Sequence, residues 1–198
     1  MYTTKLVILG RDGVLNQYRE SHVTVPEEWT PVPGALEAVA RLNHTGWHVV
    51  VATNQPGIGR GMIDMNAVNQ VHARMNQLLA AQGGRVDAVF FCPHTPEDAC
   101  DCRKPQPGML LDIGRRYGVD LKLVPMVGDT LRDLQAARAA GCQPHLVLSG
   151  RAAGLAGPAL QQLLDAMPGT AVHEDLGAFV DFLHRRDHVS DSSAGMLG

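Results

Sequence analysis

The chain has 198 residues, 45% of them hydrophobic, which excludes a wholly disordered protein and supplies the core of one ordinary domain. The formal net charge of −3 provides no basic surface field, so nucleic acid is not the expected partner. No membrane is expected as a partner either, because no apolar span is long enough. The first apolar stretch is too short for a signal peptide and no stretch approaches membrane length, so we expect a cytoplasmic protein and, by default, a monomer.

Short runs of Val, Ile and Leu alternate with segments of helical periodicity along the chain. The apolar runs predict strands at residues 5–9, 48–53, 88–92, 125–128, 145–148 and 170–172. The periodic segments predict helices at residues 35–42, 66–81, 109–117, 131–140, 159–166 and 176–183. Strands that are apolar throughout are typical of a parallel sheet covered on both faces. With right-handed crossovers, the order predicts a three-layer α/β sandwich around a mostly parallel, Rossmann-like sheet, with active residues at its carboxyl edge.

Two connections are longer than a crossover requires. Residues 14–33 contain three prolines and predict an ordered excursion over the sheet edge. Residues 93–107 are rich in Cys, His, Pro and Asp and predict a loop that is held by a cross-link of its own. Nothing indicates a second domain or a large cap, so we expect one domain over residues 1–184. Residues 185–198 are polar and predict a frayed, disordered tail.

The first predicted strand stops at Gly10, and Arg11, Asp12 and Gly13 follow in a turn. Such strand ends are where α/β proteins place phosphate chemistry, and that chemistry requires a carboxylate at the first turn position. The sequence has Gly10 there, and Asp12 is the nearest carboxylate. We expect the side chain of Arg11 to point to the opposite side from position 10, because neighbouring residues of an extended segment face opposite ways.

Three of the four cysteines lie within eleven residues, and with one histidine they have metal-ligand spacing: Cys92, His94, Cys100 and Cys102. Thiolate and imidazole are the ligands that zinc prefers, and four protein ligands leave no open position. This spacing predicts a structural zinc that fixes the loop; the alternative is a set of unrelated cysteines beside a solvated histidine. The remaining thiol, Cys142, is expected to be a small buried apolar group.

Asp129 directly follows the predicted strand at 125–128, and at that strand end its carboxylate can hold Mg²⁺. Thr130 and Asp133 fit a capping box for the following helix. The alternative interpretation makes both acids ordinary helix-start residues. We assign Arg132 to the solvated face of that helix.

Two pairs of adjacent residues could hold phosphate. Thr53 and Asn54 end a strand and precede a glycine-rich turn whose amides can bind anion oxygens, although a plain turn explains the same residues. Arg103 and Lys104 directly follow the last clustered cysteine, so a stapled loop would hold them rigidly beside phosphate charge. Two solvated cations are the alternative for that pair.

Five motifs in this order carry a resemblance to a known family: RDGVLN, TNQPGIGRG, C-x-H-x5-C-x-C, CRKPQPGM and VGDTLRDLQAA. They make residues 5–148 similar to the haloacid dehalogenase superfamily of phosphatases, and within it to the heptose bisphosphate phosphatases and the related histidinol-phosphate phosphatases. The resemblance implies Mg²⁺-dependent removal of the C7 phosphate of a heptose 1,7-bisphosphate, a lipopolysaccharide precursor, through an aspartyl-phosphate.

The resemblance also implies roles at the first and fourth strand ends. Asp12 corresponds to the general acid and then base, with a backbone carbonyl that reaches Mg²⁺, and Asp129 corresponds to the Mg²⁺ carboxylate. The attacking Asp of the family falls on Gly10, which has no oxygen for attack and no side-chain ligand for Mg²⁺. Asp12 could activate water for direct attack, but in-line geometry would be lost.

The remaining motif residues correspond to groups that bind the substrate. Thr53 and Lys104 match the phosphate-holding residues, and Asn54 and Arg103 match substrate contacts beside them. The family's zinc ligands fall on the four clustered residues: Cys92, His94, Cys100 and Cys102.

Three functions stay open at this point. The leading hypothesis is a heptose bisphosphate phosphatase impaired at Gly10. The second is a non-catalytic protein that binds a sugar phosphate, and the third is a phosphatase for histidinol phosphate or another small phosphomonoester. In each, the partner is a small phosphorylated molecule.

Overall fold

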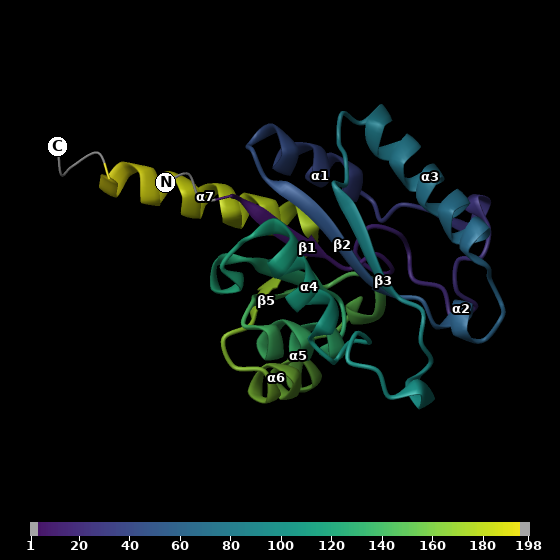
Figure 1. Cartoon of the computed structure of the whole chain (residues 1–198). Coiled ribbons are helices and arrows are strands. Elements are labelled where there is room, and N and C mark those ends of the chain that lie inside the picture. Colours follow the sequence, from purple (N-terminus) through teal and green to yellow (C-terminus); the bar gives the residue numbers. More distant parts are fainter. Residues whose placement is uncertain (1–3, 195–198) are drawn as a thin grey trace.

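The computed structural model describes residues 4–194, with side chains to residue 188, and alternates strand and helix in the predicted order (Figure 1). The strands are β1 (Leu6–Leu9), β2 (His48–Asn54), β3 (Ala88–Cys92), β4 (Pro125–Gly128), β5 (Gln143–Val147) and β6 (Ala171–His173). The α-helices are α1 (Ala35–His44), α2 (Pro56–Gly59), α3 (Met65–Ala81), α4 (Gly108–Tyr117), α5 (Leu131–Ala140), α6 (Gly157–Ala166) and α7 (Leu176–Ala194). Single 3₁₀ turns lie at Pro26–Glu28, Pro96–Asp98, Leu121–Leu123 and Gly150–Ala152.

All the strand pairings are parallel, and the strand order is β3-β2-β1-β4-β5-β6. Ile8 in the central strand β1 pairs with Val50 of β2 on one side and with Met126 of β4 on the other. The chain builds outward from β1 to β3 and then returns to add β4 beside β1. The carboxyl ends of β1 and β4 therefore form the switch point at which sheets of this order bind ligands.

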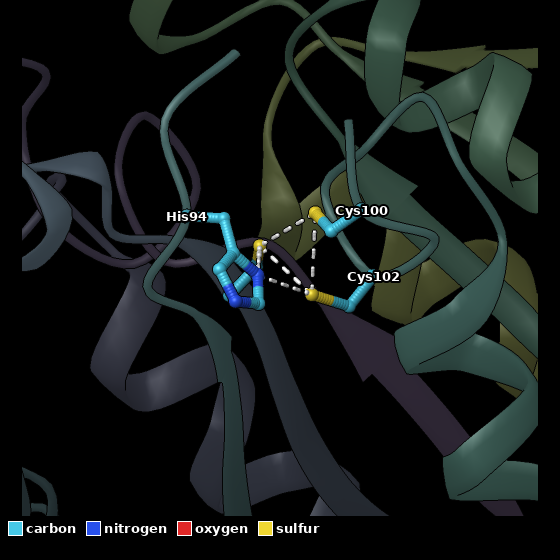
Figure 2. Close-up of side chains that lie close together, drawn as sticks. His94, Cys100 and Cys102 are labelled. Atoms are coloured by element: carbon cyan, nitrogen blue, oxygen red, sulfur yellow. Dashed lines mark hydrogen bonds between the residues drawn. The ribbon is translucent and has the colours of Figure 1, made fainter. Parts of the chain in front are cut away.

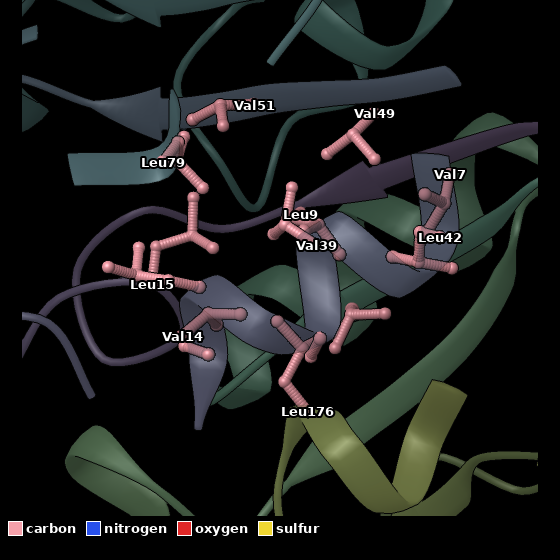
Figure 3. Packing of buried hydrophobic residues seen from close by; sticks show 14 of the residues in the cluster. Val7, Leu9, Val14, Leu15, Val39, Leu42, Val49, Val51, Leu79 and Leu176 are labelled. Atoms are coloured by element: carbon pink, nitrogen blue, oxygen red, sulfur yellow. The ribbon is translucent and has the colours of Figure 1, made fainter. Parts of the chain in front are cut away.

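Two layers of helices cover the sheet because successive residues of a strand face opposite sides. Val7 and Leu9 pack against α1, α3 and α7, as Figure 3 shows for Val39, Leu42 and Leu176. The intervening β1 residues, Leu6 and Ile8, pack against α4 and α5 on the other side. The prediction of a three-layer α/β sandwich around a Rossmann-like sheet is confirmed.

Residues 14–33 form the predicted excursion beside the carboxyl edge. Asn16 and Pro31 close it through an isolated antiparallel bridge, and the ring of Trp29 anchors it with 2% of the residue exposed. Within residues 4–194, this excursion contains one 3₁₀ turn and no folded cap.

Some element ends differ from the predicted ones. The short helix α2 begins at Pro56 inside the glycine-rich turn, where the fixed φ of proline favours a first helical position. Helix α7 continues to Ala194, beyond the predicted end at residue 183. The division into a domain and a tail at residue 184 stays a prediction, and residues 195–198 lie outside the described part. Among the described helices, none has the length and apolarity needed to cross a membrane.

Candidate active site

A pocket of about 410 Å³ opens at the carboxyl edge of the sheet, where β1, β2 and β4 end. It collects residues that lie up to 141 positions apart in the sequence, counted from Gly10 to Arg151. The pocket lining includes Gly10, Asp12, Thr53, Asn54, Arg103, Lys104 and Asp129. The structure therefore brings all the residues predicted for catalysis, substrate and magnesium into one cavity.

Gly10 sits at the end of β1, and its amide donates a hydrogen bond of 2.9 Å to the carbonyl oxygen of Val127 in β4. A Cβ atom at this position would lie 3.2 Å from Val14 Cγ2 and 3.6 Å from Val127 O. The backbone of Gly10 is outside the left-handed region. A Cβ atom therefore needs only a shift of a few tenths of an ångström by Val14, and the backbone conformation does not require glycine here.

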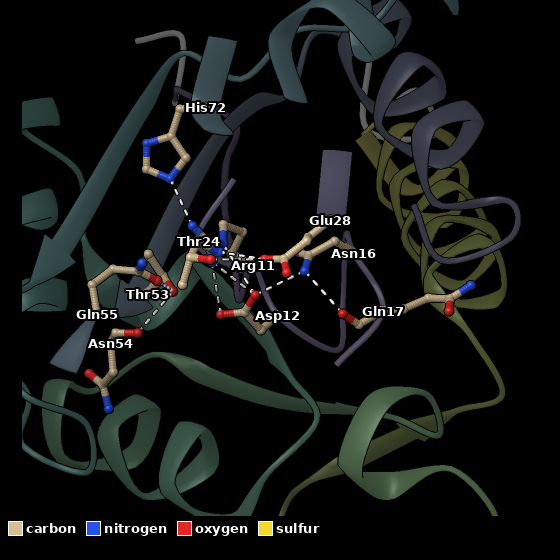
Figure 4. A network of polar contacts seen from close by, with 10 residues as sticks. All are labelled: Arg11, Asp12, Asn16, Gln17, Thr24, Glu28, Thr53, Asn54, Gln55 and His72. Carbon is tan, nitrogen blue, oxygen red and sulfur yellow. Dashed lines mark hydrogen bonds and ion pairs between the residues drawn. The ribbon is translucent and has the colours of Figure 1, made fainter. Parts of the chain in front are cut away.

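Arg11 folds back onto Asp12, as Figure 4 shows. Its Nη2 donates to Asp12 Oδ1 at 3.0 Å, and only 2% of the residue is exposed. The prediction that Arg11 points away along an extended segment is wrong. The reason is local: the Arg11 carbonyl accepts hydrogen bonds from the amides of Val14, Leu15 and Asn16, which curls residues 11–16 into a turn.

The carboxylate of Asp12 accepts hydrogen bonds from two side chains. Asn16 Nδ2 donates to Oδ1 at 2.9 Å, and Arg11 donates through Nε and Nη2. Burial opposes ionisation of Asp12, but the charge of Arg11 and these hydrogen bonds outweigh it and hold the pKa below its usual value.

Lys104 lines the pocket with only 5% of the residue exposed. Its Nζ lies 2.7 Å from Asp133 Oδ1 and donates to the carbonyl of Ala52 at 2.8 Å. Asn54 clamps the backbone of Lys104, accepting from its amide at 3.0 Å and donating to its carbonyl at 3.1 Å. The amide of Asn54 thus fixes the position of Lys104 in addition to lining the pocket.

Asp129 lies at the end of β4, and its Oδ2 accepts a hydrogen bond of 2.8 Å from the Arg151 amide. Burial and the nearby charge of Asp133 raise the pKa of Asp129 to about 7. Gly13 approaches so closely that a Cβ there would lie 2.0 Å from Asp129 Oδ2, at a φ of +82°. A buried carboxylate with an unfavourable charge fits the binding of a divalent cation, which prefers oxygen ligands.

The capping box at the start of α5 is confirmed, since the Thr130 backbone amide donates to Asp133 Oδ2 at 3.1 Å and the Asp133 amide donates to Thr130 Oγ1 at 3.3 Å. Asp133 also forms the buried ion pair with Lys104. Sequence reasoning missed that second role, because Lys104 and Asp133 lie 29 positions apart and meet only through the fold.

Thr53 ends β2 with only 3% of the residue exposed. Its hydroxyl donates to Gln55 Oε1 at 3.2 Å and lines the pocket. A hydroxyl at this edge can redirect its hydrogen bond to a phosphate oxygen.

Arginines concentrate at the mouth of the pocket. Arg60, Arg103, Arg132 and Arg151 all line it. Burial, and then the charge of Arg132, lower the pKa of Arg103, and Arg103 Nη1 is a buried donor without a hydrogen-bond partner in the described structure. Cations that repel one another and an orphaned donor favour an anionic ligand.

The prediction that Arg132 lies on a solvated face is wrong, because α5 begins at the carboxyl edge and its first turn faces the pocket. Sequence reasoning also missed Arg151, whose Nη2 donates to Tyr18 Oη at 2.6 Å. This contact joins the excursion of residues 14–33 to the turn after β5. No motif indicated it, since the two residues meet only through the fold.

The ligand atoms of the four clustered metal-ligand candidates lie within 4.8 Å of one another, and Figure 2 labels His94, Cys100 and Cys102 among them. The Sγ atoms of Cys92 and Cys100 lie 3.6 Å apart, those of Cys100 and Cys102 3.5 Å, and those of Cys92 and Cys102 2.9 Å. His94 Nδ1 lies 3.2 Å from Cys102 Sγ. Two of the sulfur separations approach the edge of a zinc–thiolate tetrahedron, which is about 3.8 Å. Burial and neighbouring thiols raise the pKa of Cys102, and a bound cation removes that penalty.

Comparison with known proteins agrees with this geometry. Two family descriptions match, HAD-hydrolase-like over residues 101–178 and polynucleotide kinase 3 phosphatase over residues 12–137. The D-glycero-beta-D-manno-heptose-1,7-bisphosphate 7-phosphatase of Bordetella bronchiseptica is 52% identical over 180 residues, which cover 90% of this chain and 97% of that protein. The chain belongs to the heptose bisphosphate phosphatase family. The predicted resemblance is confirmed.

Further proteins of the heptose bisphosphate phosphatase family are similar to this chain in sequence and in structure. The Pseudomonas aeruginosa protein of the same name is 47% identical over 178 residues, covering 90% of this chain and 97% of its own. The crystal structure of the D,D-heptose 1,7-bisphosphate phosphatase from B. bronchiseptica, complexed with magnesium and phosphate, matches with a TM-score of 0.84 at 50% identity. The matched region covers 92% of this chain and 99% of the B. bronchiseptica chain.

Proposed function

We propose that this chain is a phosphomonoester hydrolase of the C7 phosphate of D-glycero-D-manno-heptose 1,7-bisphosphate, and that Gly10 slows its chemistry. The observation that carries the proposal is the cationic pocket at the switch point, which holds Asp12, Thr53, Lys104 and Asp129 together. The names of relatives 52% and 47% identical support the substrate.

In the proposed reaction, the phosphate of the substrate lies against Thr53 and Lys104, while the arginines at the mouth attract its charge. Lys104 needs no rearrangement to do this, because Asp133 and the Ala52 carbonyl already hold its ammonium group. With a carboxylate at position 10, that group would attack phosphorus while Asp12 protonates the leaving sugar oxygen, and Asp12 would then take a proton from the water that hydrolyses the aspartyl phosphate to free phosphate. In the chain as written, water must attack phosphorus instead and lose its proton to solvent, while Asp12 protonates the leaving oxygen. Mg²⁺, held by the Asp129 carboxylate and the Asp12 carbonyl, would neutralise charge on the phosphate oxygens.

Gly10 removes the attacking carboxylate from this arrangement. In the family, that carboxylate attacks phosphorus and also ligates Mg²⁺, so one substitution removes two contributions to catalysis. Groups that act as a unit lose activity together while the others still bind substrate. The present chain is therefore expected to bind sugar phosphate well and to turn it over slowly.

The zinc assignment is part of the same proposal. Three thiols and one imidazole within 4.8 Å of one another are a closed donor set, suited to a structural ion and not to a catalytic one. Zinc there would rigidify the loop that carries Arg103 and Lys104. Reduced thiols of this kind fit the cytoplasm, where we place the protein as a monomer.

The test compares phosphate release from heptose 1,7-bisphosphate by the chain as written and by Gly10→Asp, with Mg²⁺ saturating in both. We expect the chain as written to be slower by about 10³-fold or more. Equal rates would show that the nucleophile is misassigned and that water activated by Asp12 attacks directly. If Gly10→Asp is also inactive, on this substrate and on histidinol phosphate and other small phosphomonoesters, the chain is a sugar-phosphate-binding protein instead.

A further inference from the structure

A histidine outside the family motifs contacts Arg11, the residue whose side chain binds the Asp12 carboxylate. His72 lies on α3, and its Nε2 is 3.1 Å from Arg11 Nη1 (Figure 4). Arg11 in turn contacts Asp12 through Nε at 3.3 Å and Nη2 at 3.0 Å. The three side chains form a continuous row from the helix layer to the pocket.

The chemistry of arginine settles the direction of the first contact. A guanidinium group has only donors, so His72 Nε2 must accept and its ring proton must be on Nδ1. Burial, and then the charge of Arg11, lower the pKa of His72 to about 4, which keeps the ring neutral. A neutral acceptor can hold Arg11 without repelling it.

The second contact decides which oxygen of Asp12 can carry a proton. Asp12 Oδ1 accepts from Arg11 Nε, Arg11 Nη2 and Asn16 Nδ2, at 3.3, 3.0 and 2.9 Å. Among the described residues, Oδ2 accepts one longer bond of 3.2 Å, from Arg11 Nη2. Three donors leave no room for a proton on Oδ1, so a protonated Asp12 carries its proton on Oδ2.

We propose that His72 is a positioning residue for Asp12: by holding Arg11 Nη1, it turns the other guanidinium nitrogens toward Asp12 Oδ1 and leaves Oδ2 to deliver the proton. This inference rests on the proposed function, in which Asp12 protonates the leaving oxygen. His72 itself touches neither substrate nor metal. Without it, Arg11 Nη1 loses its side-chain acceptor, and the orientation of Asp12 then depends on Asn16 and on a less firmly held guanidinium group.

The experiment uses full-length protein carrying Gly10→Asp, so that turnover is measurable. His72→Phe keeps a ring without an acceptor, and His72→Gln keeps an acceptor. Each is assayed for kcat/KM on heptose 1,7-bisphosphate, whose alkoxide leaving group needs a proton, and on p-nitrophenyl phosphate, whose leaving group does not. Arg74→Gln, on the exposed part of α3, is the matched control.

We expect His72→Phe to lower kcat/KM for the sugar substrate by roughly 10- to 100-fold, to change the aryl substrate less than about 3-fold, and to be rescued by His72→Gln. Equal losses on both substrates, or a His72→Gln variant as slow as His72→Phe, would overturn the proposal. Thermal unfolding of each variant shows whether it is folded, and the rescued variant decides if His72→Phe is not.

Failure of the proposed function is distinguishable from failure of this inference. If Gly10→Asp releases no phosphate from either substrate, the proposed function fails, and the ring ¹⁵N chemical shifts of His72 in the chain as written then decide. A protonated Nδ1 with an unprotonated Nε2 supports the hold on Arg11. A protonated Nε2 overturns it.

Discussion

At the scale of single residues, the sequence indicated which side chains gather but not always which way they point. Gly10, Asp12, Thr53 and Asp129 were placed from strand ends, because the carboxyl ends of parallel strands share one edge. Arg11 was misplaced because its direction depends on a curled turn that its neighbours in sequence do not announce. Such errors concern orientation, which only packing determines.

The buried Lys104–Asp133 ion pair provides a prediction about the stability of the protein. Replacing Lys104 by Met leaves Asp133 buried at 5% exposure without its cation, so we expect a loss of about 3–5 kcal/mol in unfolding free energy as well as weaker phosphate binding. In an Asp133→Asn background the same replacement should cost much less. Urea unfolding of the four proteins measures this coupling, and additive losses would contradict it.

Arg132 provides a second test of the pocket. Because its side chain lines the cavity beside Arg103, Arg132→Gln should weaken binding of inorganic phosphate several-fold, with little change in stability. The matched control is Arg115→Gln on α4, whose side chain is 71% exposed and paired with Asp112. Calorimetric affinities that are equal for the two variants would remove Arg132 from the site.

Asp129 makes the metal-free protein sensitive to pH. Its folded pKa of about 7 lies above the usual value for an Asp, so the folded state binds more protons than the unfolded state between about pH 4 and 7. Stability from this group is therefore lost as pH rises through that window. Asp129→Asn should remove this part of the slope, and the difference in melting temperature between the two proteins in Mg²⁺-free buffer measures it. A difference that does not vary with pH would contradict the assignment.

At the scale of elements, local rules were sufficient where the signal was local. The bounds of β3, β4 and α5 match the predicted ones, since apolar runs and a capping box define them. The end of α7 was missed because residues after 183 are polar, and the contact between Lys5 and Asp187 that fastens the helix to the start of β1 joins opposite ends of the chain.

The cysteine loop yields the element-scale prediction. Purified protein should contain about one zinc ion per chain. Cys100→Ser should lose it, lower the melting temperature and weaken phosphate binding by displacing Arg103 and Lys104. Cys142→Ala, which alters a buried thiol outside the donor set, should keep the metal. Elemental analysis of chelator-free, reduced protein decides the matter, and an absence of zinc would reject the assignment.

At the scale of the whole molecule, the fold and the pocket are independent of the one residue on which chemistry depends. The sheet, both helical layers and the cationic pocket are complete around Gly10, and a Cβ atom there requires only a small movement of Val14. Inorganic phosphate at about 100 times its Kd should therefore stabilise the chain as written and Gly10→Asp alike, by about 2.7 kcal/mol. For a domain of this size, the shift in melting temperature is about 5–10 °C. Adding Mg²⁺ should increase the shift further in Gly10→Asp, because only that protein has a carboxylate on both β1 and β4 to share the ion. Thermal melts with phosphate, with Mg²⁺ and with both separate the two effects, and a chain that phosphate fails to stabilise would mean that position 10 is needed for binding as well as for turnover.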